Sequence, residues 1–427
     1  MWNRGSPERG QSQLPSPNPA PIQPQPRPTP PASPPPSPVE VSSSTPTSPE
    51  TSAPADTTPK PTSVPPTPNK PPPPPPSAPV APSNPAPNNP TTAPVTDPSP
   101  NAAGVCPQIR VRREWRNMER DVQKSYISAV KCLLTKPSRL QPGSSRRLYD
   151  DFVFVHDRSR NSVHWVSAFL PWHRHFIYLQ EKALIECGYS GSLPRWDWTL
   201  DSDNFTKAPV WSPDPETGFG TNGAENTADP NGLGGGSVID GAFANLQLRY
   251  PDQHVLERGF TSPAKFNEGG KTYGSQYYDD TAIKVVQSSQ DFLNFRVAIE
   301  GTNPSSRGVS LPGPHGTIHM IIGGDMSPSS YAPNDPYAKI FLYGAWRPST
   351  KTIIFFLHHG NVDYHWSTWQ DASPEARLKD YSGNTVQGRN VNNAKITDML
   401  RFLNLGADLP VQKVMDTRAF PYCYEYE

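Results

Sequence analysis

The sequence predicts a mainly α-helical domain with a four-helix-bundle core and long irregular loops, preceded by a disordered proline-rich segment. Three observations support this class. Proline is concentrated at the start, with 36 of the 57 prolines in residues 1–100. Several later segments repeat apolar residues at steps of three and four, which is the helical period. All 10 histidines lie after residue 150, on or beside those segments.

The first 104 residues contain almost no aromatic or branched apolar side chains. Such a segment cannot bury enough apolar surface to offset the entropy lost on folding, so we predict that residues 1–104 are disordered and partly polyproline II. A protein module that recognises proline-rich peptides could bind this arm. Residues 105–427 are long enough for one domain with a substantial core.

Six segments of this domain have patterns typical of helices. They are residues 113–134, 148–156, 169–187 and 281–300, a segment that carries His315 and His319, and residues 355–370. The second could instead be a short strand, because it contains Phe-Val-Phe-Val. Residues 198–282 are rich in Gly, Asp, Asn and Pro and are predicted to form long loops. Because four of the helices carry or flank histidines, we expect a bundle with its site between facing helices.

Charge and hydropathy restrict the possible partners. The formal net charge is +0 and the pI is about 7.2, so no basic stripe favours nucleic acid and no polybasic patch favours a membrane surface. No apolar run approaches the roughly 20 residues of a membrane span. Residues 1–6 lack the apolar core of a signal peptide. We therefore expect either a protein that stays inside the cell or a sequence whose N-terminus lacks the true start of the protein.

The four cysteines allow three disulfide pairings, and none has the Cys-x-x-Cys spacing of a thiolate zinc site. We favour Cys106 with Cys423, which would tie the two ends of the domain, and Cys132 with Cys187. The alternative is four buried free thiols, because disulfides need an oxidising compartment.

Six histidines form two triplets with the context of metal ligands. The triplets are His156, His164 and His173, and His315, His319 and His359. On a helix, His315 and His319 point from one face and can share a metal. A zinc-protease helix would have glutamate directly after the first histidine, where this chain has Gly316. Imidazole ligands alone suit copper, zinc or iron, and two such sites predict a metal pair with redox or hydrolytic chemistry.

The second triplet also has a candidate partner for a ligand. His359 follows Phe355-Phe356-Leu357, where a histidine is costly to bury unless both ring nitrogens have partners. Asp363 lies one turn further along and is placed to accept a hydrogen bond from a ligand histidine. The alternative is an ordinary solvated or capping aspartate.

Taken together, these residues resemble the tyrosinase family of binuclear type-3 copper proteins, close to the short fungal tyrosinases and catechol oxidases. The resemblance covers about residues 106–426 and is carried by seven motifs. They are Arg113-Glu114-Trp115, Tyr149-Asp150-Asp151-Phe152, Phe169-Leu170-Pro171-Trp172-His173-Arg174, Pro194-Arg195-Trp196-Asp197-Trp198, Thr217-Gly218-Phe219-Gly220, Gly323-Gly324-Asp325-Met326 and Leu357-His358-His359-Gly360-Asn361-Val362-Asp363.

The resemblance implies two copper ions, with O2 as co-substrate and a small phenol as substrate. The first triplet would bind one copper and the second triplet the other, and His358 is the ambiguous neighbour of His359. The remaining histidines, His175, His254 and His365, are expected to be structural or to lie at the surface. Members of the family oxidise o-diphenols to o-quinones, and some also hydroxylate monophenols.

Two further residues receive catalytic roles from the resemblance. Glu300 is predicted to orient a water that deprotonates the phenol, and an ordinary glutamate at a helix end is the alternative. Gly316 stands where the family often has an asparagine linked to monophenol hydroxylation, which favours a diphenol oxidase. The motif Tyr422-Cys423-Tyr424 lies near the C-terminus, and either Arg110 or Arg112 is expected to stack on it.

One segment departs from the family pattern. The family usually has Asp-Pro-x-Phe immediately before the last histidine pair, whereas here 17 residues, 337–353, follow Asp335-Pro336. This insertion is either a gene-model error, such as a retained intron, or a genuine loop. A genuine loop could disturb the second copper site, because a ligand displaced by about 1 Å would matter. The alternatives to an oxidase are therefore an inactive member or an oxygen-binding protein, and a zinc hydrolase is a more distant one.

Overall fold

The computed structural model describes residues 105–224, 236–262, 268–302, 313–326, 352–389 and 391–427. The predicted disorder of residues 1–104 and the proposed module-binding arm lie outside the described residues. So does most of the insertion, of which Thr352 and Ile353 are described.

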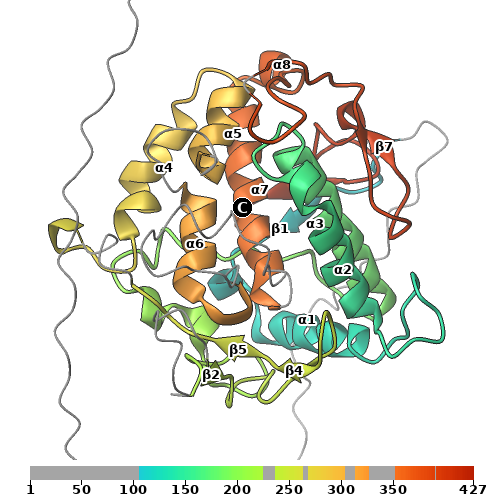
Figure 1. Cartoon of the computed structure of the whole chain (residues 1–427), viewed down its shortest axis with the longest axis vertical. Helices are drawn as coiled ribbons and strands as arrows, with labels where there is room; N and C mark the ends of the chain where they lie inside the picture. Colours follow the sequence, from blue (N-terminus) through green and yellow to red (C-terminus); the bar gives the residue numbers. More distant parts are fainter. Residues whose placement is uncertain (1–104, 225–235, 263–267, 303–312, 327–351, 390) are drawn as a thin grey trace, which may run out of the picture. The chain divides into compact units, whose positions relative to one another are not determined.

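Four helices form the core, and each carries or adjoins a predicted ligand. They are α2 (Leu148–Val163), α3 (Phe169–Glu186), α6 (Pro314–Ile322) and α7 (Ile354–Asp371). In Figure 1, α2 and α3 lie side by side, and α7 lies between α3 and α6. The mainly α-helical class is confirmed, and the arrangement of these helices agrees with the predicted bundle. The second segment is a helix rather than a strand, and it extends seven residues beyond residue 156.

The first predicted helix starts later than expected. Residues Trp115–Asn117 form a short 3-10 helix, η1, and α1 begins after Glu119 and spans Arg120–Leu133. The reason is local, because Met118 and Glu119 both have extended ψ angles near +140° that interrupt the helix. Tyr126, Val130 and Leu133 are buried, so one face of α1 packs into the core.

The single helix predicted over residues 281–300 is wrong, because two helices occupy this range. They are α4 (Asp280–Gln287) and α5 (Phe292–Glu300). The Asp279 side chain accepts a hydrogen bond from Ala282 N, and the Asp291 side chain accepts one from Asn294 N. Asp291 has an extended backbone and caps a new helix, so it breaks what would otherwise be one helix.

The remaining regular elements are short, and residues 198–282 are mostly loops, as predicted. Strand β1 (Arg110–Arg112) pairs in parallel with β8 (Tyr424–Tyr426), which joins the two ends of the domain. The other strand pairs are antiparallel: β2 (Gly236–Ser237) with β5 (Glu257–Arg258), β3 (Gln247–Leu248) with β4 (His254–Val255), and β6 (Met399–Leu400) with β7 (Leu409–Pro410). The other short helices are η2 (Phe205–Lys207), η3 (Pro209–Trp211), η5 (Glu268–Gly270), η6 (Ser275–Tyr277), η7 (Gly324–Met326), α8 (Pro374–Arg377) and η9 (Val411–Lys413).

Both favoured disulfides are confirmed. Cys106 is bonded to Cys423, beside the β1–β8 pair, and Cys132 is bonded to Cys187, between the ends of α1 and α3. The alternative of four free thiols is therefore wrong. The first bond closes a loop of more than 300 residues, so it removes much conformational freedom from the unfolded chain.

The core is rich in aromatic side chains packed between the helices. Trp172 of α3 stacks on Phe176 and on Phe402, with ring centroids 4.7 and 5.4 Å away. Phe176 also stacks on Phe356 of α7 at 5.8 Å. This packing fixes α3 against α7, the two helices that carry His173 and His359. Among the helices that the structure describes, none combines the length and apolar character needed to cross a membrane.

Candidate metal centre

The first histidine triplet converges as predicted. His156 lies on α2, His164 directly follows α2, and His173 lies on α3. Each offers a ring nitrogen, and these three atoms lie within 4.8 Å of one another. The Nε2 atoms of His156 and His164 are 3.1 Å apart. His173 Nδ1 lies 2.8 Å from the Phe169 carbonyl oxygen, which can only accept, so Nδ1 carries the proton and the Nε2 lone pair is free for a metal.

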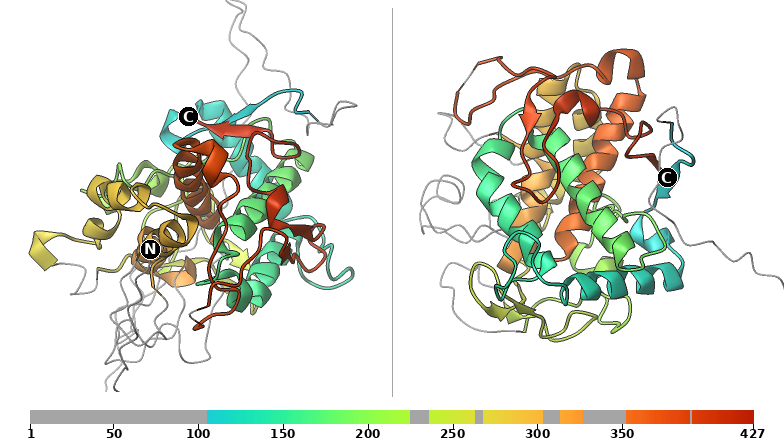
Figure 2. Two further views of the ribbon diagram at one scale, coloured as in Figure 1. Left: turned by 90° about the horizontal axis from the view of Figure 1, so that it is seen from above. Right: turned by 90° about the vertical axis from the view of Figure 1, so that its right-hand side faces the viewer.

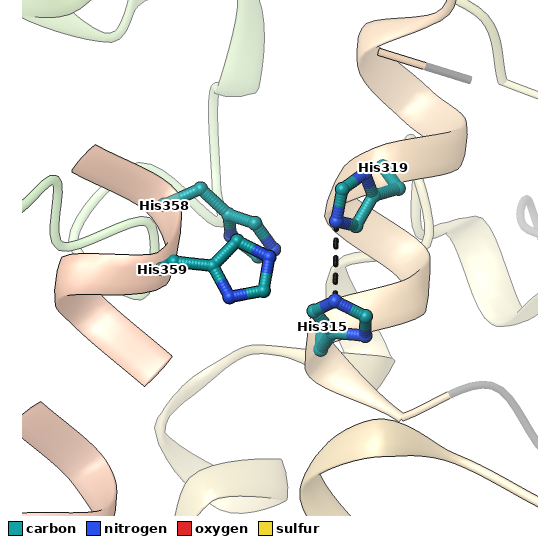
Figure 3. Close-up of side chains that lie close together, drawn as sticks. All are labelled: His315, His319, His358 and His359. Atoms are coloured by element: carbon teal, nitrogen blue, oxygen red, sulfur yellow. Dashed lines mark hydrogen bonds between the residues drawn. The ribbon is translucent and has the colours of Figure 1, made fainter. Parts of the chain in front are cut away.

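The second cluster contains four histidines rather than three. His315 and His319 lie one turn apart on α6, with their Nε2 atoms 3.1 Å apart (Figure 3). His358 and His359 both point from α7 toward α6 (Figure 3). All four offer ring nitrogens within 4.8 Å of one another, so the structure brings together the predicted ligands and also the ambiguous neighbour, His358.

Two glycines after α6 help to orient His319. Gly323 and Gly324 have φ angles of +64° and +51°, a region that glycine adopts readily. The chain therefore reverses, and the Met326 carbonyl oxygen comes within 3.1 Å of His319 Nδ1. A Cβ on Gly323 would lie 2.0 Å from the Gly259 carbonyl oxygen, so a larger residue cannot fit without movement.

The two clusters face each other across the bundle. The rings of His173 and His359 stack with centroids 4.3 Å apart and planes at 10°. The rings of His164 and His315 stack with centroids 5.8 Å apart. Metals held by the two sets would therefore be neighbours, as in a binuclear centre. His358 stacks on His315 at 5.3 Å and lies 4.8 Å from His319, whereas His359 stacks on His173. Of the two neighbours on α7, His359 is therefore the one that faces the first cluster.

Burial keeps five of the predicted ligand imidazoles neutral. It is the main cause that lowers the pKa of His156, His173, His315 and His359 well below the ordinary value of 6.5, and neighbouring imidazoles lower it further. Burial also lowers the pKa of His319 to about 3. A neutral imidazole presents a lone pair, which is the form that binds a metal.

The donor atoms fit a pair of copper ions. His173 Nε2 and both ring nitrogens of His359 are buried without a hydrogen-bond partner in the described part of the chain. Buried polar atoms without partners are costly, and a metal would satisfy them. Within the described residues, both clusters consist of histidine alone, and neutral imidazoles suit both oxidation states of copper.

Glu300 lies beside a ligand of the first cluster. It is the last residue of α5 and is buried, and its Oε1 atom lies 3.4 Å from His164 Nδ1. The same oxygen accepts a hydrogen bond of 2.6 Å from Trp165 N, and Oε2 lies 3.4 Å from Arg296 NH1. Glu300 is therefore more than an ordinary helix-end glutamate, whereas its role with water stays a prediction.

Gly316 lies on α6 directly after His315. A Cβ at this position would lie 3.6 Å from the Glu300 carbonyl oxygen, which is an ordinary van der Waals distance. The surroundings therefore leave room for a Cβ here, so packing does not exclude alanine at this position. Its link to substrate preference stays a prediction.

The prediction for Asp363 is wrong, because this carboxylate does not accept from a ligand histidine. Its Oδ1 atom accepts a hydrogen bond of 2.6 Å from Arg174 Nε, and Oδ2 accepts bonds from the hydroxyls of Tyr424 and Tyr426 at 2.5 and 2.6 Å. Arg174 was not predicted in this role. Its position directly after His173 was the available signal, because this places it on the face of α3 next to α7.

Other predicted residues have structural roles. Arg112 stacks on Tyr424, with Cζ 3.5 Å from the ring centroid, as predicted, whereas Arg110 NH1 forms an ion pair with Glu181 at 3.0 Å. The three remaining histidines lie outside both clusters. His175 contacts the Tyr422 hydroxyl at 2.7 Å, His254 contacts Asp325 at 2.8 Å, and His365 contacts Asn361 at 3.3 Å.

The end of the insertion adjoins α7, the helix that carries His358 and His359. Ile353 is the N-cap of α7, and Phe355 N donates a hydrogen bond of 3.1 Å to the Thr352 carbonyl oxygen. Both insertion residues are buried. The four histidines of the second cluster therefore come together in a chain that contains residues 337–353.

A surface cavity of about 460 Å³ lies elsewhere. It is lined by a different face of α3, including His175, Tyr178 and Lys182, and by residues such as Leu405 and Gly406. None of the histidines of the two clusters lines it. The histidine clusters, rather than this cavity, are the candidate site.

Comparisons with known proteins match this geometry. A family model described as the common central domain of tyrosinase matches residues 146–342. The tyrosinase-like protein phomQ1' of Diaporthe leptostromiformis is 36% identical over 342 residues, which cover 75% of this chain and 81% of that protein. The N-acetyl-6-hydroxytryptophan oxidase ivoB of Emericella nidulans is 31% identical over 356 residues, which cover 74% of this chain and 92% of that protein.

Among solved structures, a polyphenol oxidase variant from Thermothelomyces thermophila is similar, with a TM-score of 0.59 and 28% sequence identity. The similarity covers 77% of this chain and 91% of that chain. The likeness therefore extends over most of the described domain.

Proposed function

The chain belongs to the tyrosinase family of type-3 copper proteins, and from this premise we propose that it oxidises o-diphenols to o-quinones with O2. Its relatives support an oxidase that depends on copper. The choice of o-diphenols, and hydroxylation of monophenols as a lesser activity, are the finer parts of this proposal. The observation that carries it is the pair of facing histidine clusters.

Six residues would hold the metals. His156, His164 and His173 would bind one copper ion, and His315, His319 and His359 would bind the other. When bound, the copper pair supplies redox chemistry by passing electrons from the phenol to O2. Two o-diphenols lose four electrons and four protons, which reduce one O2 to two waters.

The protein residues around the metals position ligands and handle the phenol proton. Glu300 holds the turn at His164 through its contact with Trp165 N, and we assign it the orientation of a water that accepts the phenol proton. The stacked rings of His173 and His359 hold the two ligand sets next to each other. The aromatic packing of α3 against α7 holds this geometry before substrate arrives.

The test is O2 uptake by copper-loaded protein. We expect two copper ions per chain and one O2 consumed for every two catechol molecules, followed with an oxygen electrode and by quinone absorbance. A panel of tyrosine, catechol, a larger diphenol and a hydroxyindole would define the substrate, because the name of one relative specifies a hydroxytryptophan. Protein with two copper ions that consumes no O2 with any of these would contradict the proposal and favour an oxygen-binding or inactive protein.

A further inference from the structure

The turn that carries His164 lies against a segment distant in sequence, residues 382–387. His164 leaves α2 with an extended backbone, and Trp165 follows with a φ angle of +52°. This left-handed region is uncommon for a bulky side chain, so neighbouring contacts must hold it. The turn lies between α2 and α3, where regular helical hydrogen bonds do not fix the backbone.

Both backbone polar groups of Trp165 bind side chains from other elements. Its N–H donates to Glu300 Oε1 at 2.6 Å, and its carbonyl oxygen accepts from Asn384 Nδ2 at 2.8 Å. Asn384 Oδ1 accepts from Arg296 NH2 at 3.2 Å, and Arg296 NH1 lies 3.4 Å from Glu300 Oε2. These contacts form a closed ring that joins the ligand turn, α5 and Asn384.

Further hydrogen bonds hold residues 382–387 against the turn. Gln387 Nε2 donates to the His164 carbonyl oxygen at 3.0 Å. Ser167 N donates to the Asn384 carbonyl oxygen at 2.8 Å, and Ser167 Oγ donates to the Ser382 carbonyl oxygen at 2.7 Å. Gly383 has a φ angle of +112°, and a Cβ there would lie 2.8 Å from Ser167 Oγ. The close approach therefore depends on glycine at this position.

We propose that Asn384 is a positioning residue for the first copper site. Its side chain holds His164 and Glu300 in place through Trp165 and Arg296. The inference rests on the proposed function and extends it to a residue far from the histidine motifs. Asn384 acts through its neighbours, because its side chain bonds to Trp165 and Arg296. Loss of a group that orients a metal ligand typically weakens metal binding by about 10- to 100-fold.

Two variants and one control separate positioning from general stability. Asn384→Ala removes the side-chain contacts to Trp165 and Arg296, together with a hydrogen bond of 3.0 Å to the Val386 carbonyl oxygen. Asn384→Asp keeps an acceptor for Arg296 but cannot donate to the Trp165 carbonyl oxygen. Asn393→Ala is the matched control. Asn393 is exposed, and its side chain makes two hydrogen bonds to Thr385, at 3.0 and 2.9 Å, in the same region of the chain.

The first readout is hydrogen exchange in metal-free protein, for a peptide that covers residues 160–170. We expect exchange about tenfold faster in both Asn384 variants than in wild type, with the Asn393→Ala protein close to wild type. Copper-loaded Asn384→Ala and Asn384→Asp proteins should release one of two copper ions to a chelator about tenfold faster. Their kcat for catechol should fall about tenfold, with a KM within about twofold of wild type.

The possible failures are distinguishable. If exchange and copper release in both Asn384 variants match those of Asn393→Ala, the inference about Asn384 is overturned. If wild-type protein holds copper but oxidises no phenol, the proposed function fails. In that case the hydrogen-exchange comparison, which needs no metal, still decides whether Asn384 holds the His164 turn.

Discussion

At the scale of single residues, the second cluster offers more imidazoles than one copper needs. His358 and His359 are adjacent and both buried, and both lie with His315 and His319. We predict that His359→Ala protein retains one copper per chain, whereas His358→Ala protein retains two, because only His359 is assigned as a ligand. Metal analysis after gel filtration measures this. The reverse pattern of copper content would identify His358 as the ligand instead.

Gly316 gives a second prediction at this scale. A Cβ at this position meets only ordinary contact distances, so Gly316→Asn protein should fold and bind copper as wild type does. We expect the ratio of tyrosine hydroxylation to catechol oxidation to rise by about tenfold, worth about 1.4 kcal/mol in relative activation free energy. Gly316→Ala is the control, because it adds bulk without an amide. An equal rise in both variants would exclude a role for the asparagine amide.

At the scale of elements, the pair Arg174–Asp363 joins α3 to α7 beside a ligand of each cluster. Arg174 directly follows His173, and Asp363 lies one turn after His359; both charged groups are fully buried or nearly so. We predict that Asp363→Asn lowers the free energy of unfolding by about 3–5 kcal/mol, because it leaves a buried guanidinium without its partner charge. Urea unfolding of metal-free protein measures this.

The control for Asp363 is an exposed ion pair. Asp371 and Arg418 form a pair of 2.7 Å with both side chains almost half exposed. Asp371→Asn should cost no more than about 1 kcal/mol, since solvent screens the attraction. Similar losses for the two variants would mean that the buried pair does not stabilise the contact between α3 and α7.

At the scale of the whole molecule, the buried Glu181 of α3 joins the core to β1, the strand that pairs with β8 at the other end of the domain. Burial alone would raise the pKa of Glu181, but the guanidiniums of Arg112 and Arg110 outweigh it and lower that pKa below its usual value. Its contribution to stability is therefore present above the unfolded pKa of about 4.3 and is lost as pH falls through the folded pKa.

The lowered pKa of Glu181 predicts how the stability of a Glu181→Gln variant changes with pH. The variant should be less stable than wild type at pH 6, because Arg110 and Arg112 lose their shared partner. The difference should shrink as the pH falls from the unfolded pKa of about 4.3 toward the lower folded pKa, where wild type also loses the charge. Urea midpoints between pH 6 and pH 3 measure it. A difference that is constant over this range would show that the Glu181 charge does not contribute.

The sequence alone predicted the helical class and the six candidate ligands, and it favoured the two disulfide pairings that the structure then showed. Periodic apolar residues mark α3 and α7 because a helix must bury one face, and histidines after apolar runs stand out because burying them requires a partner. The break between α4 and α5 was not predicted, since a capping role for Asp291 depends on whether the chain turns there. The insertion was identified as a departure from the family pattern, but the sequence did not indicate that its last residue, Ile353, is the N-cap of α7.

Only the tertiary structure decided which distant residues meet. Asp363 was matched with the wrong partner because its neighbours on α3 and β8 cannot be read from spacing on α7. The tertiary structure also brings His358 into the second cluster. It places Asn384 against the turn after His164, which lies more than 200 residues away in the sequence. The physical reason is that helical periodicity specifies which face is buried, whereas side-chain contacts depend on how separate elements pack against one another.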